Sequence, residues 1–176
     1  EIIQPANTEN SGDDPIKAIL RSIMGGMMIF YAFYTGTATA QSILQEEENG
    51  TLARLFTSPT DMVTILNGKF LAGFLLIIVQ VVVLLLFARL AFGISWGSVL
   101  PLGSFSIALV ILANSFGIFI MSLIKSTKQA GIMYGAVLTF TGMLGISSVF
   151  VMGSPVEAAF NFIPLFVPQG WAMEAL

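Results

Sequence analysis

A single uninterrupted apolar stretch limits the folds open to this chain more than any other feature. Residues 70–90 read FLAGFLLIIVQVVVLLLFARL, and Arg89 is the only charged side chain among them. An α-helix rises ~1.5 Å per residue and the hydrocarbon core of a bilayer is ~30 Å thick, so about 20 apolar residues cross it. Three further runs have similar length and composition. The pattern therefore predicts four membrane-spanning segments.

The same runs predict helices rather than strands. In lipid every backbone N–H and C=O must be hydrogen-bonded within the protein, so only helices and closed β-barrels cross a bilayer. Barrel strands alternate apolar and polar residues, whereas these runs are continuously apolar. We expect an all-α, polytopic membrane protein with transmembrane helices at 23–44, 70–92, 102–124 and 130–151.

Charged residues are too few to cover a soluble domain of 176 residues. They make up 10% of the chain, against roughly 25% in an average soluble domain, and 56% of the chain is hydrophobic. The chain has no cysteine and no histidine, which removes thiolate ligands, thiol nucleophiles and the commonest general base. The net charge of −3 gives no reason to expect nucleic acid as a partner. Composition thus favours a membrane protein without a catalytic or metal site.

The connections between the apolar runs differ in character. Residues 1–22 begin with polar turn formers and predict the end of an aqueous segment with a lead-in helix. Segment 45–69 is a polar insert, 93–101 is an uncharged loop and 125–129 is a tight basic turn. Residues 152–176 contain three prolines, which favours an interfacial or re-entrant segment with Trp171 at headgroup depth. The sequence does not begin with methionine, and no signal-peptide pattern starts at Glu1. We therefore expect the chain to be part of a longer protein.

Basic residues predict the orientation of the helices, since cytoplasmic loops are enriched in Lys and Arg. One side would hold Arg54, Lys69, Lys125 and Lys128, and the other would hold Lys17, Arg21 and Arg89. The count is four basic residues against three, and we give most weight to 125–129 because this turn is short and contains two lysines. We expect 45–69 and 125–129 in the cytoplasm, with 93–101 and 152–176 outside.

The polar insert lies between the first two apolar runs and is rich in charged residues and turn formers. Glu46, Glu47 and Glu48 mark the exit from the membrane, because adjacent carboxylates do not stay in hydrocarbon. Gly50 ends or bends the helix, and a short amphipathic segment follows from Thr51.

A second short helix is predicted after that segment. Ser58 can cap it, Pro59 suits its first position and Asp61 completes a capping box. We expect two short helices across the mouths of two spans, with Lys69 snorkelling where the next span begins. Their apolar face would meet lipid headgroups or another protein. The acidic charge of the insert favours a protein partner over anionic lipid.

The insert resembles the loop between the second and third spans of ABC-2 type transporter permeases. The similarity lies in EEENGTLARLFTSP, residues 46–59, followed nine residues later by Gly68-Lys69. The sequence departs from the family pattern at Gln45, where a basic residue is usual, and at Ala53, where an acid is usual. The resemblance implies that the chain covers spans two to five of six.

It also implies a function and partners. Such a chain would be the permease subunit of an ATP-driven exporter in a bacterial or archaeal cell membrane, moving a drug, antibiotic, lipid or other amphiphile by alternating access. It would form a dimer with a second permease and would not itself be an enzyme or bind a cofactor. A separate P-loop ATPase subunit would bind ATP and Mg²⁺ and dock on the insert. The implied coupling interface comprises Glu46, Glu47, Glu48, Gly50, Thr51, Leu52, Arg54, Leu55, Phe56, Ser58 and Pro59.

Some polar residues fall within the predicted spans. Gln80 and Asn114 would either hydrogen-bond between helices or line a path for substrate. Gly131, Gly135, Gly142 and Gly145 would give the last span a small-residue face for close helix approach.

Rival classes of function have weaker support. GISWG, residues 93–97, fits the nucleophile-elbow string, but the chain has no histidine to activate Ser95. An ion channel or secondary transporter fragment would favour charged residues or broken helices at mid-membrane, and no acid lies inside a predicted span. A membrane scaffold would need no coupling insert.

Overall fold

The computed structural model describes residues 15–57, 61–124, 126–147 and 162–176. Within these ranges the chain is helical and contains no β-strand, which confirms the predicted all-α fold class. The elements are α1 (Pro15–Glu48), α2 (Thr51–Phe56), α3 (Met62–Phe92), α4 (Val99–Ser122), α5 (Thr127–Gly145), the 3₁₀ helix η1 (Pro164–Phe166) and α8 (Pro168–Ala175).

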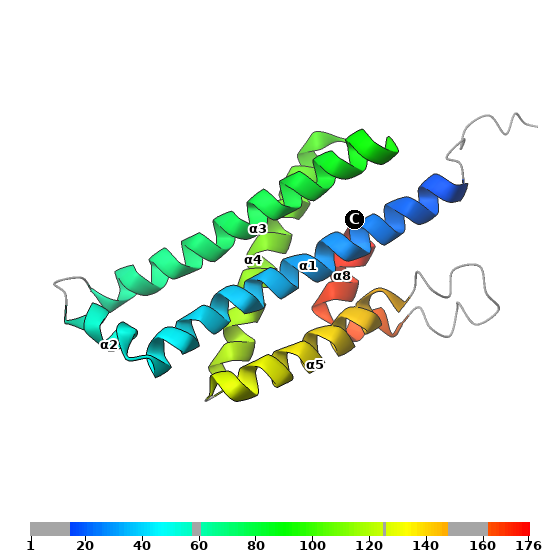
Figure 1. The fold of residues 1–176 in the computed structure, drawn as a ribbon. Helices are drawn as coiled ribbons and strands as arrows, with labels where there is room; N and C mark the ends of the chain where they lie inside the picture. The colour runs from blue at the N-terminus through cyan, green and yellow to red at the C-terminus, as the bar shows by residue number, and fades with distance from the viewer. Residues whose placement is uncertain (1–14, 58–60, 125, 148–161) are drawn as a thin grey trace, which may run out of the picture.

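α1 is the central helix of the bundle (Figure 1). It contacts α2, α3, α4, α5 and α8, and its most extensive partner is α4. Successive long helices run in opposite directions, so the end of α1, α2 and the start of α3 gather with the end of α4 and the start of α5. We call this the insert end. The start of α1, the 93–98 loop and α8 lie in the opposite half.

α1 and α4 cross with their backbones in contact. A Cβ atom added to Gly36 would lie 2.4 Å from the carbonyl oxygen of Ala113, and one added to Gly117 would lie 2.4 Å from the carbonyl carbon of Gly36. Real Cβ atoms do not approach backbone so closely. In membranes, where lipid is as apolar as the side chains, such small-residue crossings supply much of the helix association.

The glycines expected to form one face of the last span separate into two groups. A Cβ on Gly142 would meet the Phe30 ring of α1 at 2.4 Å, and one on Gly145 would meet Gln169 of α8 at 2.6 Å. A Cβ on Gly131 or Gly135 would have no described neighbour within 4 Å. Close approach is therefore confirmed for the second pair, whereas the first pair leaves open space for a Cβ atom.

The core lies where α1, α3 and α4 face one another. Phe33, Ile77 and Val110 are completely buried there. Phe33 packs edge-on against Phe116 of α4, with ring centroids 5.3 Å apart. Nearer the insert end, a second small cluster joins α1, α4 and α5 through Ala40, Met121, Ile124 and Ala130.

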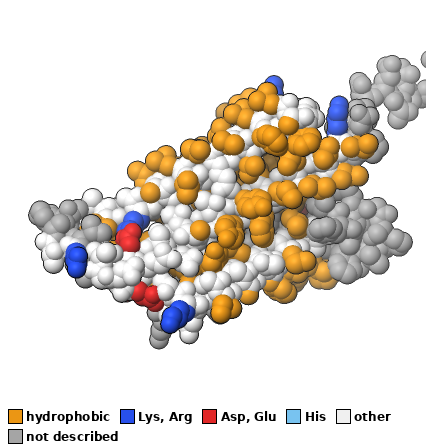
Figure 2. All heavy atoms as spheres, in the orientation of Figure 1, with side chains coloured by type: hydrophobic (Ala, Val, Ile, Leu, Met, Phe, Trp, Pro, Cys, Tyr) orange, Lys and Arg blue, Asp and Glu red, His pale blue; other side chains and the backbone are white. Residues whose placement is uncertain are grey.

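Many apolar side chains of α3 lie on the outside of the bundle. The exposed ones include Leu71, Leu75, Leu76, Val79, Val82, Val83, Leu86 and Phe87. Figure 2 shows hydrophobic side chains across the middle of the molecule and charged side chains toward its ends. Soluble monomers rarely expose so large an apolar surface, and a helix that is apolar all round is typical of membrane spans. The exposed belt therefore fits lipid as its surroundings.

Three of the described helices, α1, α3 and α4, are long and apolar enough to cross a membrane. α5 is not among them, because it begins with polar residues such as Lys128 and ends at Gly145. The last apolar residues of the predicted fourth span, 148–151, lie outside the described residues. A fourth span therefore stays a prediction.

The prediction of a separate second short helix in the insert is wrong. α3 begins at Met62 and continues through Gly68 and Lys69 into the apolar run without a break. A glycine inside a helix costs only about 1 kcal/mol relative to alanine, too little to end a helix that continues for 31 residues. Asp61 is the N-cap residue but makes no side-chain cap hydrogen bond. The predicted cap Ser58 and the predicted first helical residue Pro59 lie outside the described residues.

The other helix boundaries differ less from the predictions. α1 extends on both sides of 23–44, and α4 starts three residues before 102. In the C-terminal region η1 and the eight-residue α8 are too short to span and pack against α5. The interfacial or re-entrant placement of this C-terminal region stays a prediction, and residues 152–161 lie outside the described part.

Candidate coupling insert and intramembrane polar residues

The chain turns sharply at the end of α1. Gly50 has a φ of +68°, a left-handed conformation that favours glycine, and its N–H donates to the carbonyl of Glu47 at 3.1 Å. The Thr51 hydroxyl donates back to the Glu46 carbonyl at 3.0 Å. These bonds satisfy backbone groups at the end of α1 and hold α2 against it.

α2 presents different residues inward and outward. Leu52 is buried in the bundle, whereas Arg54 is exposed and its guanidinium group makes no hydrogen bond or ion pair within the described chain. The side chains of Leu55 and Phe56 lie outside the described ones. The inward position of Leu52 means that at least one residue of the predicted apolar face packs within this chain.

An ion pair joins the end of α1 to α3. The Lys69 ammonium group contacts the Glu46 carboxylate, and both side chains are partly buried. The sequence predicted that Lys69 would snorkel to the membrane surface. Its position in α3 directs the ammonium group to Glu46, so the charge has a protein partner, and the snorkelling stays a prediction.

A second acidic residue joins α1 to α5. Glu48 accepts hydrogen bonds from the Thr127 hydroxyl and, at 2.8 Å, from the Thr127 backbone N–H. Thr127 is the first residue of α5, and the preceding Ser126 does not cap the helix with its side chain. The Glu48 carboxylate therefore fills the capping role, where a negative charge also interacts favourably with the helix dipole.

Glu48 lies beyond the apolar stretch of α1, outside the part that would cross the membrane. The hydrogen bonds from the Thr127 side chain and backbone, helped by the nearby positive charge of Lys128, lower the pKa of Glu48 from its ordinary value. Its carboxylate is thus held in the charged form that the α5 N-terminus prefers. The sequence analysis missed this contact because 79 positions separate the two residues.

The remaining acid of the triplet behaves differently. Glu47 is exposed, and its carboxylate makes no hydrogen bond or ion pair within the described chain. Of the three acids that mark the membrane exit, two therefore bond neighbouring helices through their side chains and one faces outward. Among the described residues, no cluster of acidic side chains could hold a metal ion.

The two intramembrane amides lie between helices. Asn114 of α4 is buried and donates to the Phe70 carbonyl of α3 at 2.9 Å. Gly73 makes room for it, since a Cβ there would lie 2.6 Å from Asn114 Oδ1. Gln80 of α3 accepts a hydrogen bond from the Thr35 hydroxyl of α1. Their role in transport stays a prediction.

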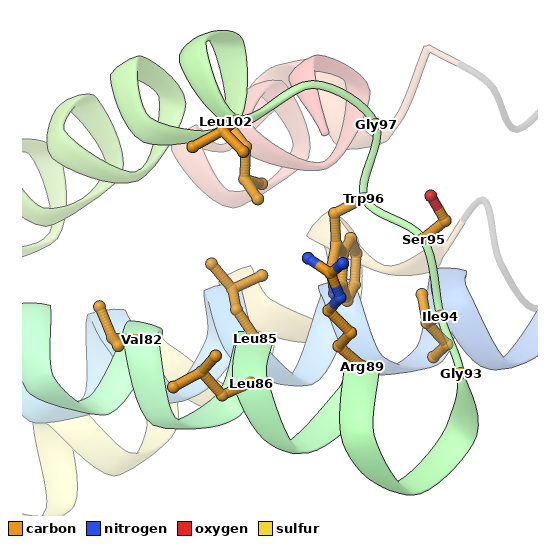
Figure 3. Close-up of a pocket in the computed structure, with 11 residues that line it drawn as sticks. Val82, Leu85, Leu86, Arg89, Gly93, Ile94, Ser95, Trp96, Gly97 and Leu102 are labelled. Atoms are coloured by element: carbon orange, nitrogen blue, oxygen red, sulfur yellow. The ribbon is translucent and has the colours of Figure 1, made fainter.

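A groove and a cavity occur elsewhere on the described surface. The groove, of about 680 Å³, lies between α1 and α5 and is lined by residues that include Ser22, Met27, Tyr31, Thr139 and Met143. The cavity, of about 530 Å³, lies where α3 ends and α4 begins (Figure 3). Neither is lined by Gln80 or Asn114.

The described fold and its polar end define a class of protein. Long helices with an exposed apolar belt, joined at one end by a charged insert, form a multi-pass membrane protein. The comparison with known families then identifies it more closely. The chain belongs to the ABC-2 transporter family, whose model, described as an ABC-2 family transporter protein, matches residues 3–175. The resemblance seen in residues 46–69 is confirmed.

A characterised relative supports the same assignment. The chain is 29% identical over 159 residues to the linearmycin resistance permease protein LnrN of Bacillus subtilis (strain 168). The match covers 86% of this chain and 39% of the relative's length. No solved structure matches the chain at a significant level. Family membership places the chain in the membrane part of a transporter.

Proposed function

We propose that the chain is the permease part of an ATP-driven exporter and that its insert receives motion from a separate ATPase subunit. The observation that carries this proposal is the bonding of the insert end. Glu46 reaches α3 and Glu48 reaches α5, so both helices are joined to the end of α1 beside α2. A partner that displaces α2 would therefore act on three long helices together.

The exposed surface of α2 suits a docking site. Arg54 faces outward without a partner in the described chain, and Glu47 lies exposed at the end of α1. A protein partner with complementary charges could bind both residues without breaking the bonds of Glu46 and Glu48. The ATPase subunit would bind ATP and Mg²⁺ and perform the hydrolysis. Its nucleotide-dependent movement would drive alternating access in the permease.

The substrate we propose is an amphiphile of the antibiotic or lipid type. The relative's name connects it with resistance to linearmycin. In this chain, the groove between α1 and α5 combines apolar walls with a few hydroxyl groups, including those of Ser22, Tyr31 and Thr139. Such a lining is typical of sites for largely apolar ligands. A second permease copy would complete the exporter in the cell membrane, with the insert in the cytoplasm.

Charge reversal at Arg54 tests the docking site. Because the Arg54 side chain is exposed and makes no hydrogen bond or ion pair in the described chain, Arg54→Glu should leave the fold intact. We expect it to abolish most transport and most substrate-stimulated ATPase activity in the full-length permease assembled with its ATPase subunit. Arg54→Lys keeps the charge and should retain most of both activities.

Two measurements define a negative result. If Arg54→Glu reaches the membrane at the parental level and transports at the parental rate, α2 is not the docking site. A channel or secondary transporter fragment, the alternative function, would show transport that does not change when the ATPase subunit is omitted.

A further inference from the structure

A cavity lies at the end of α3 that is farthest from the insert. It has a volume of about 530 Å³ and is bounded by α3, the 93–98 loop and the start of α4. Figure 3 shows Val82, Leu85 and Leu86 along its α3 wall and Leu102 reaching in from α4. Its walls are therefore mainly aliphatic.

One charged residue belongs to this otherwise apolar lining. Arg89, in the last turn of α3, extends toward the loop that carries Trp96 (Figure 3). Its guanidinium group is exposed and makes no hydrogen bond or ion pair with the described part of the chain. No acidic residue lines the cavity. An anion that enters would meet five N–H donors without competition from a carboxylate.

Trp96 adds two further features beside Arg89. The Arg21 guanidinium of α1 lies over its ring, 5.9 Å from the centroid, which brings a second positive charge to this region. The indole Nε1 is buried and has no acceptor among the described residues. A bound oxygen beside the ring is the kind of acceptor that this donor lacks.

The position of the cavity decides between soluble and membrane ligands. Arg89 lies at a helix end, where basic side chains reach headgroup depth. From there the aliphatic wall continues along α3 into exposed Val82, Val83 and Leu86 of the apolar belt. A free anion would use only the polar end, whereas a lipid uses both.

We propose that this cavity binds an anionic phospholipid, with its phosphate on Arg89 and one acyl chain along Val82 and Leu86. This site is separate from the insert and does not depend on the exporter mechanism. The binding energy would come from apolar burial together with a charge-assisted hydrogen bond in a region of low dielectric.

Trp96 can report on the lipid directly. The probe is phosphatidylglycerol with brominated acyl chains, compared with brominated phosphatidylcholine, in nanodiscs that contain the full-length permease. Other tryptophans, including Trp171, are changed to phenylalanine, and ATPase stimulation checks that this background is active. We expect the anionic lipid to quench Trp96 fluorescence at a several-fold lower mole fraction than the zwitterionic lipid.

Three variants and one soluble anion make the result specific. Arg89→Gln should remove the preference and Arg89→Lys should keep part of it. Lys17→Gln, which removes a charge in the same half of the bundle away from the cavity, should leave the preference unchanged. Equal quenching by both lipids, or a preference that survives Arg89→Gln, overturns the proposal. So does loss of the preference when inorganic phosphate replaces chloride at equal ionic strength, because the site would then bind a soluble anion.

Failure to quench Trp96 with either lipid would also overturn it, since another part of the permease would then cover the cavity. The test is independent of the coupling proposal, because lipid binding at Arg89 and the effect of Arg54→Glu are measured separately.

Discussion

At the scale of single residues, Gly36 and Gly117 fit tightly where α1 crosses α4. Each lies where a Cβ atom would meet the backbone of the other helix. The neighbouring atoms are backbone rather than the end of a flexible side chain, so the helices themselves would have to separate. Crowding of a packed core typically costs about 1–3 kcal/mol.

Gly117→Ala should therefore lower the stability of the full-length permease by ~1–3 kcal/mol, measured by thermal unfolding in detergent. Gly103 is the matched control, because it lies in the same helix and a Cβ there would have no described neighbour within 4 Å. Gly103→Ala should be neutral or slightly stabilising, as alanine favours helices. Equal effects of the two variants would show that the α1–α4 contact is looser than described.

Sequence reasoning could not have paired these two glycines. It recognised glycines as points of close helix approach but could not determine which helices cross, because that depends on the packing of the whole bundle. The same limit applies to Glu48 and Thr127, which are far apart in sequence and adjacent in space. Composition did indicate the three long apolar helices α1, α3 and α4, since lipid burial acts on each apolar run separately.

At the scale of elements, the insert is a short helix bonded to its neighbours rather than two independent helices. The continuity of α3 through Gly68 places Lys69 on the same rigid helix as the apolar run. The local sequence suggested a break there because Gly68 and Lys69 resemble a helix boundary. The cost of one glycine is small beside the cost of nucleating a new helix.

The bonds of Glu46 and Glu48 can be tested at this scale. Lys69→Gln removes the ion pair to α3, and Glu48→Gln weakens the cap on α5 while keeping the size of the side chain. We expect each to reduce the amount of substrate transported per ATP hydrolysed several-fold, because ATPase movement would no longer reach that helix efficiently. Transport and hydrolysis are measured in the same vesicles.

Asp61 provides the control for these two changes. It lies at the insert end as the N-cap of α3 but makes no side-chain cap hydrogen bond. Asp61→Asn should keep the parental ratio of transport to hydrolysis. If all three variants keep that ratio, the polar contacts are structural and do not transmit motion.

At the scale of the whole molecule, charge and apolar surface are separated along the bundle. The belt of exposed aliphatic residues lies between an insert end with bonded acids and an opposite half with Arg21, Arg89 and Trp96. In the proposed exporter the two regions have different tasks. The insert end would receive motion from the ATPase, and the opposite half would contact lipid headgroups.

The orientation of the bundle is the premise on which the coupling proposal depends. The 176 residues contain no cysteine, so Thr57→Cys introduces a single thiol reporter at an exposed position beside α2 and leaves Arg54 unchanged. The most direct measurement is labelling of that thiol with a membrane-impermeant maleimide in the full-length protein. The account predicts no labelling in intact cells, labelling after permeabilisation, and protection when the ATPase subunit is bound. Labelling from outside intact cells would contradict it.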